Sequence, residues 1–355
     1  MTDHTNVSLS LEKWHGAHND FYFLQKDSLE ETCLKPTWIP ALCDRYSGLG
    51  ADGVVLWYVD PSYLTLDHSS KSLKVFLRIW NADGSATLTC GNALRCLTAL
   101  VLDFVAHRPE FQSLGQAAPK LEFLSYDPNS LVFQDKKLKF RTVAWGLNSH
   151  PLAPNLKEHQ VDVLIDSQET TLVSARKVDA HLLPAGLPND LQVAYVELAN
   201  PHLVLLSQSH EWQNPDFVKI WGKWFQSQEG RDFVRPILEL DALPVSNISF
   251  LQWKKYGPQE AQTPIIYPLM VYERGAGFTQ ACGTGATACA MVLQNFHNVG
   301  TTPSPLSTFP FALPGGILKV YEKEEQMSLD SSKAYLKQWV LSGPACKIAN
   351  LNVKL

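Results

Sequence analysis

Short hydrophobic runs dominate the pattern along this chain, and most of them predict β-strands. The runs are rich in Val, Ile, Leu and aromatic residues, and Pro, Asn, Asp and Gly bound them, as is typical of strands. Many short strands with few helices between them predict a mixed α+β fold. The predicted strands cover residues 73–80, 120–126, 162–166, 193–198, 202–206, 265–273 and 338–343.

A helical pattern covers residues 215–227. Pro215 follows Asn214 at the position where helices often start. Hydrophobic residues recur on one face of this helix, and we expect that face to pack into the core rather than to bind a ligand. These residues are Phe217, Ile220, Trp221, Trp224 and Phe225.

Two distant segments share a second helical pattern. Residues 86–104 read ATLTCGNALRCLTALVLDF, and residues 278–296 read FTQACGTGATACAMVLQNF. Each has a threonine before Cys-Gly, then small residues, a second cysteine and an apolar tail with amphipathic helical spacing. One motif used once in each half predicts two matched lobes that meet at a cleft. The apolar positions are Leu94, Leu97, Leu100, Val101 and Phe104, then Ala286, Cys289, Val292, Leu293 and Phe296.

Three stretches break the pattern. Residues 145–160 are polar and punctuated by proline, which predicts a linker, and residues 299–316 predict a loop. The Gly-rich stretch 48–53 lacks the third glycine and the preceding strand of a dinucleotide-binding motif, so it predicts a turn.

Composition narrows the function classes. The length of 355 residues predicts about two domains. With 45% hydrophobic and 18% charged residues, the chain can bury a sizeable core. A net charge of −5 without a basic block argues against nucleic-acid binding, and a small metabolite is an easier partner. No apolar run approaches the roughly 18 residues of a membrane helix, and the N-terminus lacks a secretory signal pattern. We therefore expect no membrane contact and a cytoplasmic location.

The seven cysteines are too few and too scattered to predict a disulfide framework. The sequence has no C-x-x-C pair and no histidine pair at metal spacing beside them, so we expect no metal site. Most of these cysteines should be small buried side chains. They are Cys33, Cys43, Cys96, Cys289 and Cys346.

Cys90 and Cys282 differ, because each precedes a glycine at a predicted helix start. The first N–H groups of a helix and its dipole favour a bound anion such as a carboxylate. The same field lowers a thiol pKa from about 8.5 towards neutrality. One thiolate could remove the α-proton of an amino acid while the other thiol protonates the opposite face. Such an inversion formally requires no cofactor.

Several sequence blocks, in order and spanning nearly the whole chain, resemble the diaminopimelate epimerases, a family of PLP-independent amino-acid epimerases. The most specific pair is NADGS-x₄-CGN and ERG-x₄-ACGTG. The blocks are KWHGAHNDFYFL (13–24), LCDRYSGLGADGVV (42–55), RIWNADGSATLTCGNALRC (78–96), ELANPHLVL (197–205), SNISFLQ (246–252), VYERGAGFTQACGTGATAC (271–289) and LSGPA (341–345).

The resemblance implies two similar, pseudo-symmetric α/β lobes with the active site in the cleft between them. The expected N-terminal lobe covers residues 1–150, with the C-terminal strand of about 340–355 returning to it, and the C-terminal lobe covers 151–339. Cys90 and Cys282 match the proton-transfer pair of the family, and His202 matches a residue near the thiols. The residues that match substrate-binding positions are Asn19, Asn81, Gly91, Asn92, Asn200, Asn247, Glu273, Arg274, Gly283 and Thr284.

The chemistry of Glu273 and Arg274 fits the substrate-binding role that the resemblance implies. Arg274 can hold a distal carboxylate with two hydrogen bonds, and Glu273 can accept from a distal ammonium. Taken alone, a Glu-Arg pair is more often a surface ion pair, and an Asn in such a motif is more often a turn residue.

The chain departs from the family pattern at Ala17-His18, Ala93-Leu94, Phe278 and Gln280, and it is longer around residues 57–74, 103–140 and 207–245. These departures concern substrate preference more than mechanism. The predicted activity is inversion of LL-2,6-diaminopimelate to the meso form, in lysine and peptidoglycan biosynthesis. The alternatives are a racemase of another amino acid, a non-catalytic amino-acid-binding protein and a cysteine hydrolase. The resemblance is also compatible with a homodimer.

Overall fold

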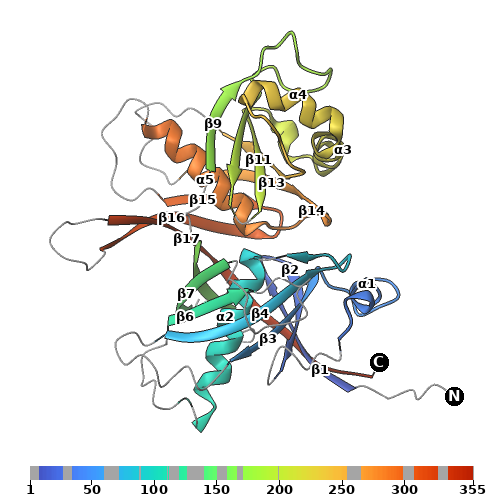
Figure 1. Cartoon of the computed structure of the whole chain (residues 1–355), viewed down its shortest axis with the longest axis vertical. Helices are drawn as coiled ribbons and strands as arrows, with labels where there is room; N and C mark the ends of the chain where they lie inside the picture. Colours follow the sequence, from blue (N-terminus) through green and yellow to red (C-terminus); the bar gives the residue numbers. More distant parts are fainter. Residues whose placement is uncertain are drawn as a thin grey trace. The chain divides into compact units, whose positions relative to one another are not determined.

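The computed structural model divides the chain into two compact units. Unit 1 comprises Met1–Val163 and Gly343–Leu355, and unit 2 comprises Leu164–Ser342. Each unit is described by itself (Figure 1). The expected lobe boundary between residues 150 and 151 lies outside the described residues. The structure describes residues 8–26, 34–59, 72–87, 89–109, 111, 120–125, 140–149, 158–165, 171–198, 200–253, 265–298, 308–326 and 335–354.

Unit 1 is built from strands and two α-helices. Its helices are α1 (Ile39–Cys43) and α2 (Gly91–Ala106). The strands are β1 (Ser8–Gly16), β2 (Asn19–Gln25), β3 (Gly53–Val59), β4 (Ser72–Asn81), β5 (Ala86–Thr87), β6 (Lys120–Ser125), β7 (Phe140–Ser149), most of β8 (Glu158–Ile165) and the C-terminal part of β17 (Tyr335–Lys354).

Strand pairing in unit 1 is mixed. β1 is antiparallel to β2 and to the end of β17, and β2 is parallel to β3. β3 is antiparallel to β4, β4 is parallel to β6, and β6 is antiparallel to β7. β5 folds back on β4 as a short hairpin immediately before α2. This hairpin therefore sets where α2 begins.

Unit 2 contains the remaining strands and three helices. The helices are α3 (Pro215–Gln226), α4 (Gln228–Leu238) and α5 (Gly283–Asn298). The strands are β9 (Thr171–Lys177), β10 (Gln192–Glu197), β11 (Pro201–Ser207), β12 (Asn247–Gln252), β13 (Tyr267–Glu273), β14 (Gly277–Thr279), β15 (Thr308–Leu313), β16 (Gly316–Gln326) and the N-terminal part of β17.

Unit 2 repeats the strand pairing of unit 1. β10 is antiparallel to β9 and β11, β11 is parallel to β12, and β12 is antiparallel to β13. β13 is parallel to β15, and β15 is antiparallel to β16. β14 folds back on β13 just before α5, as β5 does on β4 before α2. The predicted α+β fold with two similar lobes is confirmed.

The register of the two hairpins makes the two Cys-Gly motifs equivalent. Thr87 pairs with Ile79 in unit 1, and Thr279 pairs with Val271 in unit 2. Three residues after each threonine stands the cysteine that precedes the helix. The internal repeat in the sequence is therefore a repeat of the fold.

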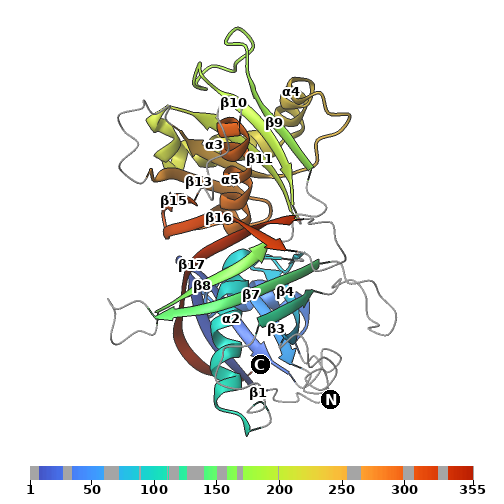
Figure 2. The same cartoon turned by 90° about the vertical axis from the view of Figure 1, so that its left-hand side faces the viewer.

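Each sheet wraps around its central helix. α2 contacts β1 and β2 as well as β7, and α5 contacts β9 to β12 as well as β16 (Figures 1 and 2). Because strands approach α2 from several sides, its polar residues Arg95 and Thr98 are as buried as its apolar ones. The predicted helix is confirmed and its apolar positions Leu94, Leu97, Leu100 and Val101 are buried, but the wrapped sheet covers its polar side as well.

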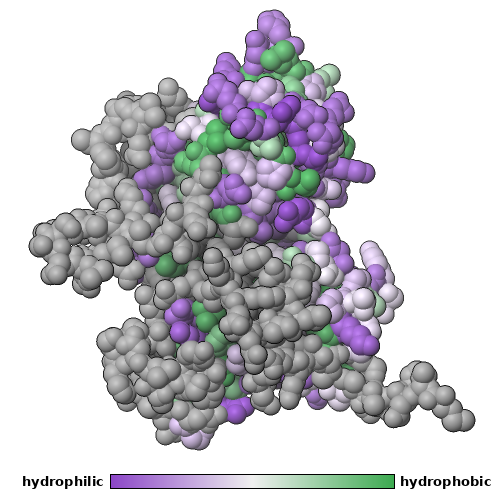
Figure 3. All heavy atoms as spheres, in the orientation of Figure 1, coloured by the Kyte–Doolittle hydropathy of each residue, from purple (hydrophilic) through white to green (hydrophobic). Residues whose placement is uncertain are grey.

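Helices α3 and α4 pack against the strands of unit 2 through a core that includes Phe225, Val234 and Phe250. The predicted helix at 215–227 is confirmed, and the Asn214 side chain accepts a hydrogen bond from the Asp216 N–H at 3.0 Å. Ile220 is 66% exposed, so its predicted place on the core face is wrong. Hydrophilic side chains predominate over this side of unit 2 (Figure 3).

Strands occupy parts of the predicted linker and of the predicted loop. In the predicted linker 145–160, β7 extends to Ser149 and β8 begins at Glu158, and residues 150–157 lie outside the described residues. In the predicted loop 299–316, residues 308–313 form β15, and residues 299–307 lie outside the description. The proline and glycines there mark a tight β15–β16 turn, in which Gly316 has a φ of 130°.

The β1–β2 turn places two residues other than glycine in the left-handed region. Ala17 has a φ of 52° and His18 a φ of 62°, and the flanking residues Gly16 and Asn19 pair across the hairpin. Such a conformation costs an L-residue roughly 1–2 kcal/mol. The His18 N–H donates to His15 Nδ1 at 3.2 Å. This strained turn lies at one of the departures from the family pattern.

Replacement of His18 by glycine should raise the free energy of unfolding by about 1 kcal/mol, because glycine adopts positive φ without strain. Ala17→Gly is the matched control. Ala17 is buried, so its lost methyl group, worth about 0.8 kcal/mol, should offset the relief of strain. Urea unfolding measures both changes, and a destabilised His18→Gly variant would show that the turn is not strained.

Candidate active site

Cys90 stands at the N-cap of α2 in unit 1. Its backbone is extended, with φ −147° and ψ 112°, and its side chain makes no cap hydrogen bond to the helix. The Cys90 carbonyl accepts the first helical hydrogen bond, from the Leu94 N–H at 2.9 Å. Cys90 is half-buried, whereas Gly91 and Asn92 are buried. The thiol is thus placed beside the N–H groups that begin a helix, where an anion is favoured.

Asn19 and Asn81 lie at one end of the unit 1 sheet. Asn19 Nδ2 donates to Asp52 Oδ2 at 3.0 Å, and the residue after Asp52, Gly53, pairs with Asn81. Asn81 Nδ2 donates to Ser85 Oγ at 3.0 Å within its own turn. β3 therefore brings two predicted substrate-binding residues from separate motifs together.

The α2 start lies at the same end of the sheet as Asn19. Gly16 pairs with Asn19 across the β1–β2 hairpin. A Cβ atom on Gly16 would lie 3.0 Å from the Asn92 carbonyl oxygen and 3.2 Å from Arg95 Nη2. The hairpin thus approaches the first turn of α2 closely enough to require glycine. Asn19, Asn81, Asn92 and Cys90 therefore lie at the same end of unit 1.

A charge network stabilises this end of unit 1. Arg45 Nη2 contacts Asp20 Oδ1 at 2.6 Å and Asp52 Oδ1 at 2.8 Å, and Lys13 Nζ lies 2.9 Å from Asp20 Oδ2. Burial alone would raise the pKa of Asp20, but hydrogen bonds and charge from Arg45 and Lys13 outweigh it and lower that pKa. Burial raises the pKa of Asp52, with the Asp20 charge adding to the effect. The Gly-rich stretch 48–53 carries this turn, as predicted.

Cys282 precedes α5 in unit 2 and is 3% exposed. The Gly285 N–H donates to Cys282 Sγ at 3.4 Å, and Thr284 Oγ1 lies 3.5 Å from the same sulfur. The Cys282 carbonyl accepts from the Ala286 N–H at 3.0 Å. One backbone N–H and one hydroxyl group of the first helical turn therefore contact this sulfur.

The remaining predicted residues of unit 2 lie at strand ends. Asn247 begins β12 and pairs with His202 of the parallel strand β11. The Asn247 side chain accepts a hydrogen bond from the Arg274 N–H at 2.8 Å. Glu273 ends β13 and accepts from Thr279 Oγ1 at 2.6 Å, while Arg274 itself is exposed. The turn after β13 therefore presents an acidic and a basic residue together.

Asn200 and His202 lie at the start of β11. The Asn200 carbonyl accepts from the Leu198 N–H at 3.3 Å. His202 is fully buried, and burial lowers its pKa to about 3, so its ring is neutral at physiological pH. Neither of its ring nitrogens has a hydrogen-bond partner among the described residues. The unused donor and acceptor of His202 fit a supporting place in a polar site.

Topology makes the clusters of the two units equivalent residue by residue. The registers that align β2, β3 and β4 with β11, β12 and β13 make Asn19 equivalent to Asn200 and Asn81 equivalent to Glu273. The motif that follows aligns Cys90 with Cys282 and Asn92 with Thr284. The structure thus gathers the predicted site residues into one cluster per unit.

Three residues that lie in these clusters were assigned no site role from the sequence. Arg95 and Thr287 both lie on the buried side of their helices, where their hydrogen bonds run to the first turn. Gly285 packs so closely that a Cβ would lie 3.2 Å from Ser249 Oγ and 3.3 Å from Cys282 Sγ. All three follow the Cys-Gly motifs, so their spacing from the cysteines was the available signal.

The other described cysteines are buried, as predicted. Burial raises the pKa of Cys43 to about 12, and it also raises the pKa values of Cys96 and Cys289. Cys346 is buried as well, and none of these thiols is in a disulfide. Cys33 lies outside the described residues. In the described part of the chain, only Cys90 combines a helix start with partial exposure.

Searches for other kinds of site found little in the described residues. They contain no group of three or more His, Cys, Asp or Glu side chains that could hold a metal ion. The helices among them are all too short or too polar to cross a bilayer.

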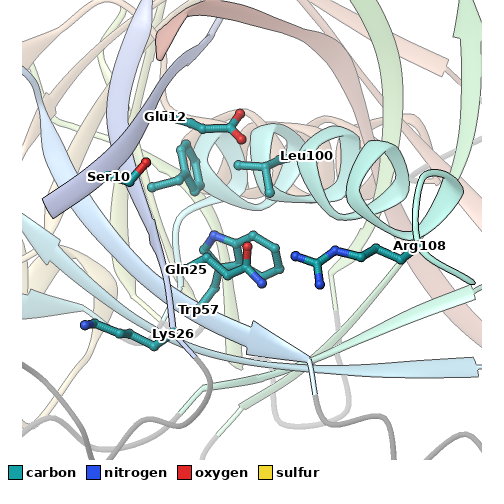
Figure 4. A pocket seen from close by; sticks show the side chains of 8 residues that line it. Ser10, Glu12, Gln25, Lys26, Trp57, Leu100 and Arg108 are labelled. Carbon is teal, nitrogen blue, oxygen red and sulfur yellow. The ribbon is translucent and has the colours of Figure 1, made fainter. Parts of the chain in front are cut away.

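A separate hollow of about 370 Å³ lies in unit 1 near the C-terminal end of α2 (Figure 4). Arg108 and Trp57 line it, together with Glu12, whose carboxylate already contacts Lys347 Nζ at 2.8 Å and Trp14 Nε1 at 3.0 Å. No predicted site residue lines this hollow. It is therefore distinct from the cluster around Cys90.

Sequence comparisons place this chain beside enzymes of one kind. Residues 12–111 match the profile of the family described as diaminopimelate epimerase. The diaminopimelate epimerase of Synechocystis sp. is 27% identical over 359 residues, covering 96% of this chain and 98% of that protein. The one from Synechococcus sp. is 29% identical over 319 residues, covering 88% and 90%.

Solved structures with a similar fold are more distant in sequence. A hydroxyproline epimerase from Agrobacterium vitis, with bound trans-4-hydroxy-L-proline, superposes with a TM-score of 0.56 at 10% identity, covering 98% of this chain and 93% of that one. A probable proline racemase from Agrobacterium radiobacter, with bound carbonate, gives a TM-score of 0.53 at 10% identity and the same coverage. At this identity the likeness shows the fold alone.

Replacement of Asp20 by asparagine should lower the free energy of unfolding by about 2 kcal/mol at pH 7, because Arg45 and Lys13 lose a charged acceptor. The folded-state pKa of Asp20 lies below its ordinary value of 3.8. Its contribution is therefore present above that pH and is lost as the pH falls through the lower folded-state pKa. Urea unfolding of both proteins between pH 7 and pH 3 measures the difference. The exposed Asp241→Asn is the control, and an unchanged Asp20→Asn difference at low pH contradicts the prediction.

Replacement of Gly285 by alanine should destabilise the protein by about 1–3 kcal/mol, because the added methyl group crowds Ser249, Val271 and Cys282. Helix propensity alone would favour alanine by about 1 kcal/mol, so the sign separates packing from propensity. Thermal and urea unfolding give the change. The double variant Gly285→Ala/Ser249→Ala should recover part of the loss, and a stabilised single variant would refute the close packing.

Proposed function

As its motifs predict, the chain is related to the diaminopimelate epimerases, and from this we propose that it inverts one α-carbon of LL-2,6-diaminopimelate to give the meso form. The chain is an isomerase of the PLP-independent epimerase class. One observation carries the finer proposal. Cys90 and Cys282 occupy equivalent places, each at the start of a buried helix in units with the same strand order.

The proposed reaction uses one thiol from each unit on a single α-carbon. The thiolate of one cysteine removes the α-proton. The electron pair of the broken C–H bond then passes into the carboxylate, which becomes enolate-like. The thiol of the other cysteine then delivers its proton to the opposite face, which inverts the centre and leaves that sulfur as the thiolate. The two cysteines exchange roles in the reverse direction.

The helix starts supply the electrostatic part of this proposal. Gly91 and Asn92 in unit 1, and Gly283 and Thr284 in unit 2, are the residues whose N–H groups would hold the reacting carboxylate. Negative charge grows on that carboxylate in the transition state, so donors fixed at a helix start stabilise the transition state more than the substrate. The proposed chemistry needs only these groups and the two thiols, without a cofactor.

The distal amino-acid end of the substrate requires a cation and acceptors. Arg274 is exposed and can pair with the distal carboxylate, while Glu273 can accept from the distal ammonium. Asn247 fixes the Arg274 backbone, and Thr279 orients the Glu273 carboxylate. Asn19, Asn81 and Asn200 would add side-chain donors and acceptors.

His202 has a supporting part in the proposal. Its pKa of about 3 keeps the ring neutral, so it can hydrogen-bond near the thiols but carries no charge at neutral pH. It is therefore not assigned a proton-transfer step. The proposed place of the reaction is cytoplasmic lysine and peptidoglycan-precursor biosynthesis.

Solvent-proton exchange tests the proposed function. The protein should incorporate deuterium at an α-carbon of LL-diaminopimelate in D₂O without added cofactor, as followed by NMR. Cys90→Ala and Cys282→Ala should each lower the rate of inversion by roughly 10²–10⁴-fold, because each removes one proton-transfer group. Cys43→Ala is the matched control, since Cys43 is a buried cysteine that ends α1 instead of preceding a helix.

The outcomes separate the hypotheses. A wild-type protein that exchanges no diaminopimelate proton would contradict the proposed substrate. Exchange only with single-headed amino acids would support a racemase of another amino acid instead. Full activity in either alanine variant would exclude the two-thiol mechanism.

A further inference from the structure

Arg95 is a fully buried cation at the helix start that carries Cys90. Its side chain is 0% exposed. Nη1 donates to the Gly91 carbonyl at 3.3 Å, Nη2 to Asn92 Oδ1 at 2.7 Å, and Nε to the Pro344 carbonyl at 3.3 Å. Two of these three acceptors belong to residues proposed to hold the reacting carboxylate. The guanidinium therefore fixes the first turn of α2 from inside unit 1.

No carboxylate among the described residues balances this charge. The hydrogen bonds of Arg95 run only to carbonyl and amide oxygens, and no described residue forms an ion pair with it. Burial lowers its pKa to about 10, which still leaves the guanidinium protonated at neutral pH. A buried charge without a counter-ion costs several kcal/mol, so such a group favours any anion that forms beside it.

Cys90 and Cys96 are the titratable groups whose charge acts on Arg95. Cys96 is fully buried, and burial raises its pKa far above neutrality, so it stays a thiol. β17 contributes Cys346, which acts on Cys96, and β1 approaches with the uncharged Gly16. Cys90, half-buried at the helix start, remains as the thiol that can become an anion next to this cation.

We propose that Arg95 is a positioning residue of the site: it holds the Gly91–Asn92 turn, and its unbalanced charge favours the thiolate of Cys90 over that of Cys282. This inference rests on the proposed two-thiol function. It assigns Cys90 as the thiolate of the resting protein and Cys282 as the thiol. A substrate carboxylate at the same helix start then also lies beside a fixed positive charge.

The equivalent position in unit 2 lacks the charge. Thr287 stands five residues after Cys282, as Arg95 stands five after Cys90. Its hydroxyl donates to the Gly283 carbonyl at 3.0 Å, which matches the Arg95 bond to Gly91. Cys282 is also more buried than Cys90, and burial disfavours a thiolate. One helix start is thus supported by a cation and the other by a neutral hydroxyl.

The test measures the alkylation rate of each cysteine against pH, with iodoacetamide and peptide mass spectrometry on the full chain. In the wild type, Cys90 should titrate at a lower pH than Cys282. Arg95→Met should raise the apparent pKa of Cys90 by about one unit, which slows its alkylation at pH 7 by roughly tenfold. Arg95→Lys keeps the charge and should restore most of that reactivity.

Two internal controls separate electrostatics from damage to the fold. Cys96 is fully buried, so it should stay unreactive unless Arg95→Met opens the α2 packing. Thr287→Val removes the equivalent hydrogen bond in unit 2 and should leave the Cys90 titration unchanged. If Arg95→Met exposes Cys96, the comparison of Arg95→Lys with the wild type separates the two roles. A purely structural role of Arg95 predicts that both Arg95 variants lose Cys90 reactivity equally, whereas an electrostatic role predicts that Arg95→Lys keeps it.

An unchanged Cys90 titration in folded Arg95→Met would overturn the proposal, as would a wild type in which Cys282 titrates first. These readouts need no substrate, so they stand apart from the deuterium-exchange test of the proposed function. With an active protein, Arg95→Met should lower kcat more than it raises KM at pH 7. Raising the pH should recover part of the lost kcat, because more Cys90 is then ionised.

Discussion

The burial of a helix start inside a wrapped sheet is the constraint on which the rest of this structure depends. A buried helix start brings several backbone donors into a core that offers them no water. In unit 1, Cys90 precedes that start, and in unit 2 Cys282 does. Both the strand order and the short hairpin before each helix serve to place it there. An anion, whether thiolate or carboxylate, is the natural partner of such a position.

Repetition of one fold gives two such positions, and local differences make them unequal. The strand pairing agrees from β1 to β7 and from β10 to β16. Within that common frame, Arg95 has the neutral counterpart Thr287, and Asn81 has the acidic counterpart Glu273. The proposed inversion requires the two faces of the carbon to be treated differently, because one thiol would give a proton and the other would take one. In the proposed reaction, the substitutions within the repeat would supply that difference.

Charged groups help to hold the loops near the helix start of unit 1. Asp20, Arg45, Lys13 and Asp52 connect the β1–β2 hairpin to the turn before β3. Backbone strain in that hairpin persists because the surrounding pairs determine its shape. Rigid support of this kind keeps donors at fixed positions, and fixed donors stabilise a developing charge without reorganising.

The sequence by itself determined the strand-rich α+β fold, the repeat and the two Cys-Gly motifs, because short hydrophobic runs and residue spacing are local properties. Its motifs also resemble those of the diaminopimelate epimerases. Only the tertiary structure decided that α2 is buried on its polar side, that Arg95 lies there with no carboxylate partner among the described residues, and that residues 308–313 form a strand. Burial depends on strands distant in the chain that close around a helix, and no local pattern encodes that closure.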